Sequence, residues 1–158
     1  MAHSSRLAAP LVRMPTPPPT RIASVDYGNR RVGLALTDPL ALFAQPAGTY
    51  APGEALTRLA ALHAEHGLAA IVVGWPLEDD GSEGHAVDRV RPFVGRLKKL
   101  VPGVPIVQQD ERDTSRRAVA ALVEAGVPRG ARRQKERVDA AAAVLILTDW
   151  LEDRQGGA

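Results

Sequence analysis

The sequence contains no cysteine, few aromatic residues and almost no excess of either charge. The missing cysteines exclude disulfide frameworks, zinc–thiolate sites and cysteine nucleophiles, and they agree with a reducing compartment such as the cytoplasm. A net charge of +2 over 158 residues attracts an anionic partner only weakly, so the placement of the charges matters more than their sum. A chain of this length is expected to form one domain with its own core.

Long apolar runs are also missing. No run approaches the roughly 20 residues needed to span a bilayer, and the amino-terminal segment lacks the apolar core of a secretion signal. Residues 1–20 instead carry five prolines without helical or strand period, which predicts a disordered leader. With a short disordered tail at 155–158, the folded domain is expected at 21–154. We therefore expect a cytoplasmic protein without a membrane partner.

The stretch RIASVDYGNRRVGLALTD at 21–38 is the most informative part of the chain. Its pattern predicts a buried strand, a tight turn and a returning strand, with Asp26 at the end of the first strand. Arg30 and Arg31 follow within the turn. Charges gathered at one tip suit a metal or a phosphate, and a hairpin tip with a local salt bridge explains them equally well at this point.

The remaining chain alternates strand and helix patterns, which is typical of an α/β domain. A third strand at 40–50 would complete an antiparallel meander. The apolar run at 69–73 predicts a strand buried on both faces and parallel to the first. A fifth strand is expected at 104–109, and helices are expected at 54–66, 83–100, 114–125 and 137–153.

Three carboxylates come from separate elements to what is expected to be one edge of the sheet. Asp26 ends the first strand, Glu111 follows the fifth, and Asp139 lies in the first turn of the last helix. Clustered carboxylates repel one another unless cations lie between them, and hard oxygen ligands favour Mg²⁺ or Mn²⁺. A pair of such ions can activate a water and stabilise the leaving oxygen of a phosphodiester. The pattern therefore indicates a metal-dependent nuclease site.

Basic residues gather at 127–136, VPRGARRQKE, a stretch that is expected to be a loop. With Arg30, Arg31 and Arg112 they predict contacts to the phosphates of a nucleic acid. Solvated surface charge is the alternative explanation. The candidates within the stretch are Arg129, Arg132, Arg133 and Lys135.

Four motifs in this order resemble the YqgF/RuvX family of the RNase H-like superfamily, pre-16S ribosomal RNA nucleases or Holliday-junction-resolvase-like proteins. The resemblance covers about residues 21–153. It implies an RNase H-like α/β fold, a mixed five-stranded sheet with flanking helices, and a divalent-metal site in which Asp26, Glu111 and Asp139 are catalytic residues and metal ligands. The motifs are DYGNRRVGLALTD at 26–38, IVVGWPLEDDGSEG at 71–84, DERDTS at 110–115 and KERVDAAAAVLIL at 135–147.

Two departures from the family pattern add negative charge near the expected site. Glu78 and Asp79 stand where the family usually has a neutral Asn–Met pair, and Asp113 replaces a usual leucine. They either weaken substrate binding or add metal affinity. In an RNase H-like sheet the fourth strand lies beside the first, so Glu78 or Asp80 can also join or replace Glu111 in the metal site.

The implied activity is hydrolysis of phosphodiester bonds. The preferred candidate substrate is the 5′ end of pre-16S ribosomal RNA in a small-subunit precursor. The alternative substrate is branched DNA, the Holliday junction. A resolvase would favour a weak homodimer, and RNA trimming suits a monomer.

A sugar-kinase or actin-like ATPase would need two related domains, and the chain has no internal repeat. A non-catalytic nucleic-acid-binding ribosome-assembly module remains the alternative of another class.

Overall fold

A mixed five-stranded sheet forms the centre of the fold, as predicted. The computed structural model describes residues 10, 20–111, 113–132 and 135–156, so most of the predicted leader and the last two residues of the predicted tail lie outside it. The strands are β1 (Arg21–Tyr27), β2 (Val32–Thr37), β3 (Ala44–Tyr50), β4 (Leu68–Trp75) and β5 (Ile106–Asp110). Their order is β3-β2-β1-β4-β5. The meander of β1 to β3 is antiparallel, and β4 is parallel to both β1 and β5.

The helices of the described residues are α1 (Pro52–His66), α2 (His85–Leu100), α3 (Thr114–Glu124), α4 (Arg129–Arg132) and α5 (Lys135–Gly156). The prediction of a loop at 127–136 is wrong in part, because α4 and the start of α5 lie within this stretch. Ala, Arg, Gln, Lys and Glu are good helix formers, so this composition allows a helix as readily as a loop. Within the described ranges, no helix combines the length and the apolar character that a membrane crossing needs.

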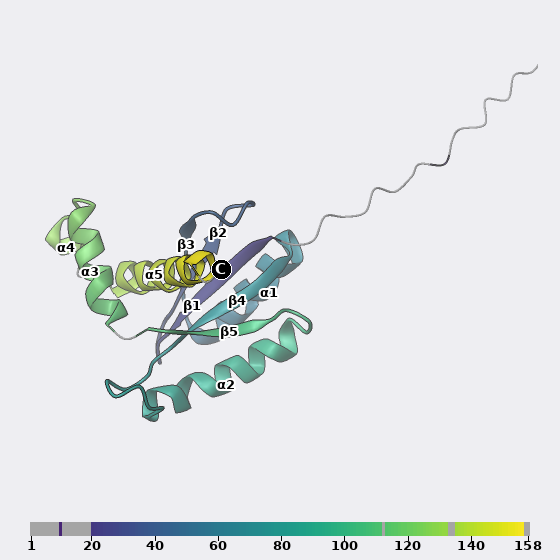
Figure 1. The fold of residues 1–158 in the computed structure, drawn as a ribbon, viewed down its shortest axis with the longest axis horizontal. Helices are drawn as coiled ribbons and strands as arrows, with labels where there is room; N and C mark the ends of the chain where they lie inside the picture. Colours follow the sequence, from purple (N-terminus) through teal and green to yellow (C-terminus); the bar gives the residue numbers. More distant parts are fainter. Residues whose placement is uncertain (1–9, 11–19, 112, 133–134, 157–158) are drawn as a thin grey trace, which may run out of the picture.

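Two apolar layers hold the sheet between the helices (Figure 1). Ala23 and Val25 pack with residues of α1 and α2, whereas the alternate residue Ile22 packs with α5. This alternation follows from the period of two along a strand. In β4, Ile71 belongs to the first layer and Val72 to the second, which confirms that this strand is buried on both faces.

Close contacts fix the amino-terminal half of α5 against the meander. A Cβ on Gly33 would lie 2.1 Å from the carbonyl oxygen of Asp139, so β2 and the helix backbone touch directly at this glycine. The hydroxyl of Ser24 donates to the carbonyl of Ala143 at 2.6 Å, and that of Thr49 donates to the carbonyl of Glu136 at 2.8 Å. These contacts place the first turns of α5 over the edge where β1 ends.

Candidate active site

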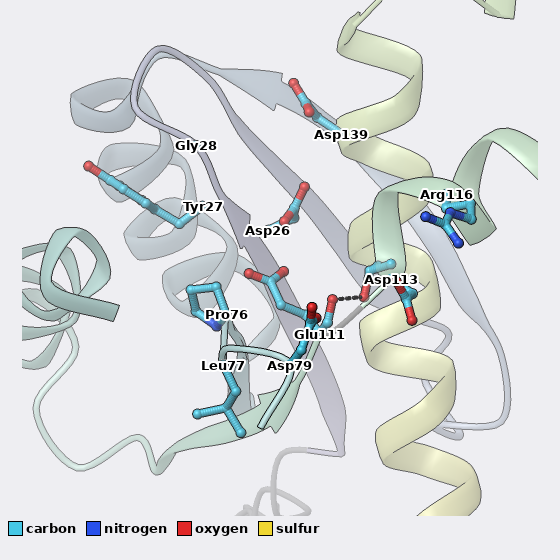
Figure 2. Close-up of a pocket in the computed structure, with 11 residues that line it drawn as sticks. Asp26, Tyr27, Gly28, Pro76, Leu77, Asp79, Glu111, Asp113, Arg116 and Asp139 are labelled. Carbon is cyan, nitrogen blue, oxygen red and sulfur yellow. Dashed lines mark hydrogen bonds between the residues drawn. The ribbon is translucent and has the colours of Figure 1, made fainter. Parts of the chain in front are cut away.

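The carboxyl ends of β1, β4 and β5 meet at one edge of the sheet, because the three strands are parallel. Asp26 is the penultimate residue of β1 and Glu111 directly follows β5. The amide of Glu111 donates to the carbonyl of Trp75 at 3.2 Å, which continues the pairing of β4 with β5. Figure 2 shows the side chains of Asp26 and Glu111 lying close together at this edge.

Gly74 explains how Glu111 reaches Asp26 although β4 lies between their strands. A Cβ at Gly74 would lie 2.5 Å from Oε2 of Glu111 and 2.6 Å from Cδ1 of Ile146. The missing side chain leaves the space through which Glu111 crosses β4. The expectation that the fourth strand lies beside the first is confirmed, and it does not prevent contact between Asp26 and Glu111.

The two carboxyl groups share a hydrogen bond and have raised pKa values. Burial raises the pKa of Glu111 to about 9, and the charge of Asp26 and the hydrogen bond to it act in the same direction. Burial also raises the pKa of Asp26 to about 6, although the hydrogen bond from Glu111 opposes this change. At neutral pH Glu111 is therefore protonated and donates to the carboxylate of Asp26.

Asp139 lines the same cavity, which has a volume of about 540 Å³, as Asp26 and Glu111. Its negative charge contributes to the raised pKa of Asp26. The Nε of Arg31 donates to Oδ2 of Asp139 at 3.2 Å, and Figure 2 shows the carboxylate of Asp139 pointing away from the Asp26–Glu111 pair. Across the part of the chain that the structure describes, no three acidic or histidine side chains gather closely enough to form a metal-binding group. The predicted residues thus form a touching pair with a third carboxylate on the cavity wall.

The pair fits a hard divalent cation by its chemistry. Both side chains offer oxygen atoms, which Mg²⁺, Mn²⁺ and Ca²⁺ prefer. Burial and mutual repulsion make the doubly ionised pair unfavourable without a cation, and a bound cation would take the place of the shared proton. Asp139, on the wall of the same cavity, would supply a third carboxylate to the ligand set.

The acidic loop between β4 and α2 contributes Asp79 to the cavity, and neither Glu78 nor Asp80 lines it. Asp80 accepts hydrogen bonds from the amide and the hydroxyl of Ser82, at 2.9 and 2.6 Å, and these bonds lower its pKa. Glu78 is turned toward Gly84, where a Cβ would lie 2.1 Å from Oε1. The turn therefore occupies Glu78 and Asp80 locally and presents Asp79 to the cavity.

The start of α3 adds lining residues that the sequence did not single out as ligands. Asp113, noted only as a departure, precedes the helix in a left-handed conformation with φ 61°. The hydroxyl of Thr114 donates to the carbonyl of Glu111 at 2.6 Å. Arg116 also lines the cavity and is a basic residue that the sequence analysis missed. The sequence feature that could have indicated Arg116 is the TSRR run at 114–117, which opens a helix shortly after the DER motif.

The predicted basic residues are divided between two places. Arg30 and Arg31 line a second cavity of about 450 Å³, whose wall includes Asp139. Arg129 is exposed on α4 and lines neither cavity; Figure 1 shows α4 well away from the sheet. Arg132 ends α4 and Lys135 begins α5. Arg112 and Arg133 lie outside the described residues.

Comparison with solved structures defines the class of protein. A structure titled T. thermophilus RuvC in complex with Holliday junction substrate has a TM-score of 0.53 and 18% identity, over 86% of this chain and 96% of that chain. A second Thermus thermophilus RuvC structure has a TM-score of 0.52 and 19% identity, over 87% of this chain and 97% of that one. The fold is thus the RNase H-like fold of RuvC.

Sequence comparison gives the family. The model of the family described as "RuvX: Holliday junction resolvase" matches residues 20–153. A "Putative pre-16S rRNA nuclease" of Salinibacter ruber is 49% identical over 131 residues, which are 83% of this chain and 92% of the relative. One of the same name from Chlorobium phaeobacteroides is 38% identical over 136 residues, 86% of this chain and 94% of the relative. The chain belongs to the RuvX family, and it is a nuclease that hydrolyses phosphodiester bonds in nucleic acid.

Proposed function

We propose that this nuclease is a Mg²⁺- or Mn²⁺-dependent endonuclease that processes the 5′ end of pre-16S ribosomal RNA in the cytoplasm. Asp26, Glu111 and Asp139 are its metal ligands and catalytic residues. The observation that carries the proposal is the contact of Asp26 with Glu111 across Gly74, with Asp139 on the wall of the same cavity. The names of the relatives from Salinibacter ruber and Chlorobium phaeobacteroides support the ribosomal precursor as substrate.

The residues of the site have separate tasks in this proposal. Asp26 and Glu111 would hold the cation in place of their shared proton, and Asp139 would supply a further oxygen. When bound, the cation supplies Lewis-acid activation of water and neutralises charge on the phosphodiester. Arg30 and Arg31, in the neighbouring cavity, hold the phosphate backbone beside the carboxylates, since guanidinium groups bind phosphates in a bidentate manner.

A cleavage assay tests this proposal. The substrate is an RNA that joins precursor sequence to the mature 5′ end of 16S ribosomal RNA, with Mg²⁺ or Mn²⁺ added. Asp26→Asn, Glu111→Gln and Asp139→Asn should each lose nearly all cleavage, and a chelator should stop the wild-type protein. Asp88→Asn, on the exposed side of α2, removes a carboxylate that does not line the cavity and should cut normally. If all three site variants cut as well as wild type, the assigned site is wrong.

Holliday-junction resolution is the second candidate, and the description of the matching family favours it. The same proteins are therefore assayed on a four-way DNA junction, and the relative rates on the two substrates decide between them. A resolvase that cuts two strands symmetrically would act as a homodimer, which sedimentation of the protein with the junction would detect. Binding without metal-dependent cleavage of either substrate would instead support a non-catalytic ribosome-assembly module.

A further inference from the structure

Asp139 stands on a wall shared by two cavities of opposite character. On one side it lines the acidic cavity together with Asp26 and Glu111. On the other side it lines the cavity formed with Arg30 and Arg31. A carboxylate at this position can bind a cation in the first cavity or accept a hydrogen bond from a guanidinium in the second. In the structure, the carboxylate of Asp139 accepts a hydrogen bond from the guanidinium of Arg31.

The turn between β1 and β2 holds Arg31 in place for this contact. The amide of Gly28 donates to the carbonyl of Arg31 at 2.9 Å, and a Cβ on Gly28 would lie 2.6 Å from that same oxygen. Besides the 3.2 Å bond to Asp139, Nη1 of Arg31 lies 3.6 Å from Oε1 of Glu136. The side chains of Arg31 and Asp139 are only 33% and 26% exposed, so water weakens this pair less than it weakens a surface pair.

We propose that Arg31 is a positioning residue that couples nucleic-acid binding to cation binding: it holds Asp139 in the free protein and releases it when a substrate phosphate takes the guanidinium. This inference rests on the proposed nuclease function. It explains why Asp26, Glu111 and Asp139 line one cavity while the described residues form no three-ligand group.

The coupling follows from competition for one carboxylate. A divalent cation in the acidic cavity must compete with Arg31 for Asp139, so cation binding to the free protein is weaker than the three carboxylates would allow. A phosphate group in the second cavity offers Arg31 a bidentate anionic partner. Once Arg31 has turned to the phosphate, its contact with Asp139 no longer opposes the cation. Because linkage is reciprocal, each ligand strengthens the binding of the other by the same factor.

The first test measures Mn²⁺ affinity without nucleic acid, by calorimetry on folded wild type, Arg31→Gln and Arg30→Gln. Arg30 lies one residue away, exposed in the same turn, so Arg30→Gln measures the effect of removing one positive charge. Arg31→Gln should bind Mn²⁺ about tenfold more tightly than Arg30→Gln does. Equal Mn²⁺ affinities of the two variants, or no Mn²⁺ binding by either Arg31→Gln or wild type, would overturn the proposal.

A double-mutant cycle shows whether the gain acts through Asp139. In an Asp139→Asn background, Arg31→Gln should produce no more tightening of Mn²⁺ than Arg30→Gln does, because the competed carboxylate is gone. If the tenfold gain persists without Asp139, Arg31 acts on the cation by another route and the proposal fails. Circular dichroism and a thermal melt of each variant confirm that the proteins compared are folded.

The second test adds a four-way DNA junction with phosphorothioate linkages, and a denaturing gel confirms that its strands stay intact. Saturating junction should tighten Mn²⁺ binding to the wild-type protein about tenfold and leave the affinity of Arg31→Gln almost unchanged. A wild-type protein that binds the junction with unaltered Mn²⁺ affinity would refute the coupling. A protein that binds no junction would refute coupling through junction DNA and the Holliday-junction candidate but not the ribosomal-precursor proposal, and a tenfold gain in the first test would still show that Arg31 restrains Asp139.

Discussion

Glu111 donates a hydrogen bond to Asp26 across the backbone of β4, beside Gly74, the glycine of that strand. The contact joins the ends of two strands that are not neighbours in the sheet. It places a shared proton between two partly buried carboxyl groups when no cation is bound. The stability and the pH response of the fold are therefore linked to the chemistry of the site.

The first prediction concerns pH. The ordinary pKa values of Asp26 and Glu111 are 3.8 and 4.5, and the folded values are about 6 and about 9. At a pH between the ordinary and the folded pKa of each group, the folded state keeps a proton that the unfolded state has lost. The free energy of unfolding therefore falls as pH rises through this range. The stabilisation by these protons is complete below about pH 4 and lost above about pH 9, with a slope of about 1.4 kcal/mol per pH unit for each proton.

Urea unfolding in a chelator, at intervals from pH 6 to 9, measures this slope. Glu111→Gln should remove the contribution of Glu111 to the slope and be the more stable protein at pH 8, because the wild-type chain must take up a proton at Glu111 when it folds and the amide needs none. Asp88→Asn, away from the site, should keep the wild-type slope. A Glu111→Gln protein with the wild-type slope would show that Glu111 does not hold the proton.

The second prediction concerns the cation. At pH 8, Mn²⁺ should raise the melting temperature of the wild-type protein, because a ligand that binds only the folded state stabilises it. The increase should be much smaller for a protein with both Asp26→Asn and Glu111→Gln. Thermal melts over a range of Mn²⁺ concentrations measure the effect, and an equal increase in both proteins would place the cation elsewhere.

The third prediction concerns the contact between β2 and α5. Gly33→Ala would put a Cβ 2.1 Å from the carbonyl oxygen of Asp139, and the helix backbone cannot yield as a flexible side chain would. We expect a loss of stability of about 1–3 kcal/mol, together with reduced cleavage because Asp139 is displaced. Gly95→Ala, in α2 with no atom within 4 Å of the added Cβ, should instead stabilise by about 0.5–1 kcal/mol. Denaturant unfolding compares the two, and equal stabilities would contradict the close contact.

The fourth prediction concerns the two acidic departures from the family pattern that line the cavity, Asp79 and Asp113. Their charges repel phosphates when no cation is present, so Asp79→Asn with Asp113→Asn should bind nucleic acid more tightly in a chelator. Asn tolerates the left-handed conformation at position 113, so the fold should be kept. Glu78→Gln is the control, since Glu78 does not line the cavity. Fluorescence anisotropy measures the affinities, and an equal gain from Glu78→Gln would show a non-local charge effect.

The fifth prediction concerns the basic stretch around α4. Reversing the charges at Arg132 and Arg133 should weaken nucleic-acid binding and flatten its dependence on salt, because fewer counterions are released on binding. Arg96→Glu, exposed on α2, should have a smaller effect. Affinities measured over a series of salt concentrations give the slope, and an unchanged slope would remove this stretch from the interface.

The sequence by itself determined the class of fold and the edge that carries the site. Apolar runs of strand length, a run buried on both faces and helices with one apolar face are local patterns, and each led to an element found in the structure. The parallel strands then required Asp26 and Glu111 to share an edge, because side chains that follow parallel strands emerge on the same side of a sheet. The family motifs assigned a role to Asp139 before any contact was known.

Only the tertiary structure decided which of these side chains meet. Asp79 rather than Glu78 or Asp80 lines the cavity, because hydrogen bonds within the turn orient neighbouring residues in ways that spacing does not encode. Asp139 contacts Arg31 where the backbones of β2 and α5 approach closely at Gly33, and Glu111 reaches Asp26 because Gly74 leaves room for its side chain. The raised pKa values arise from burial and from a neighbouring charge, and both exist only when distant segments are packed together.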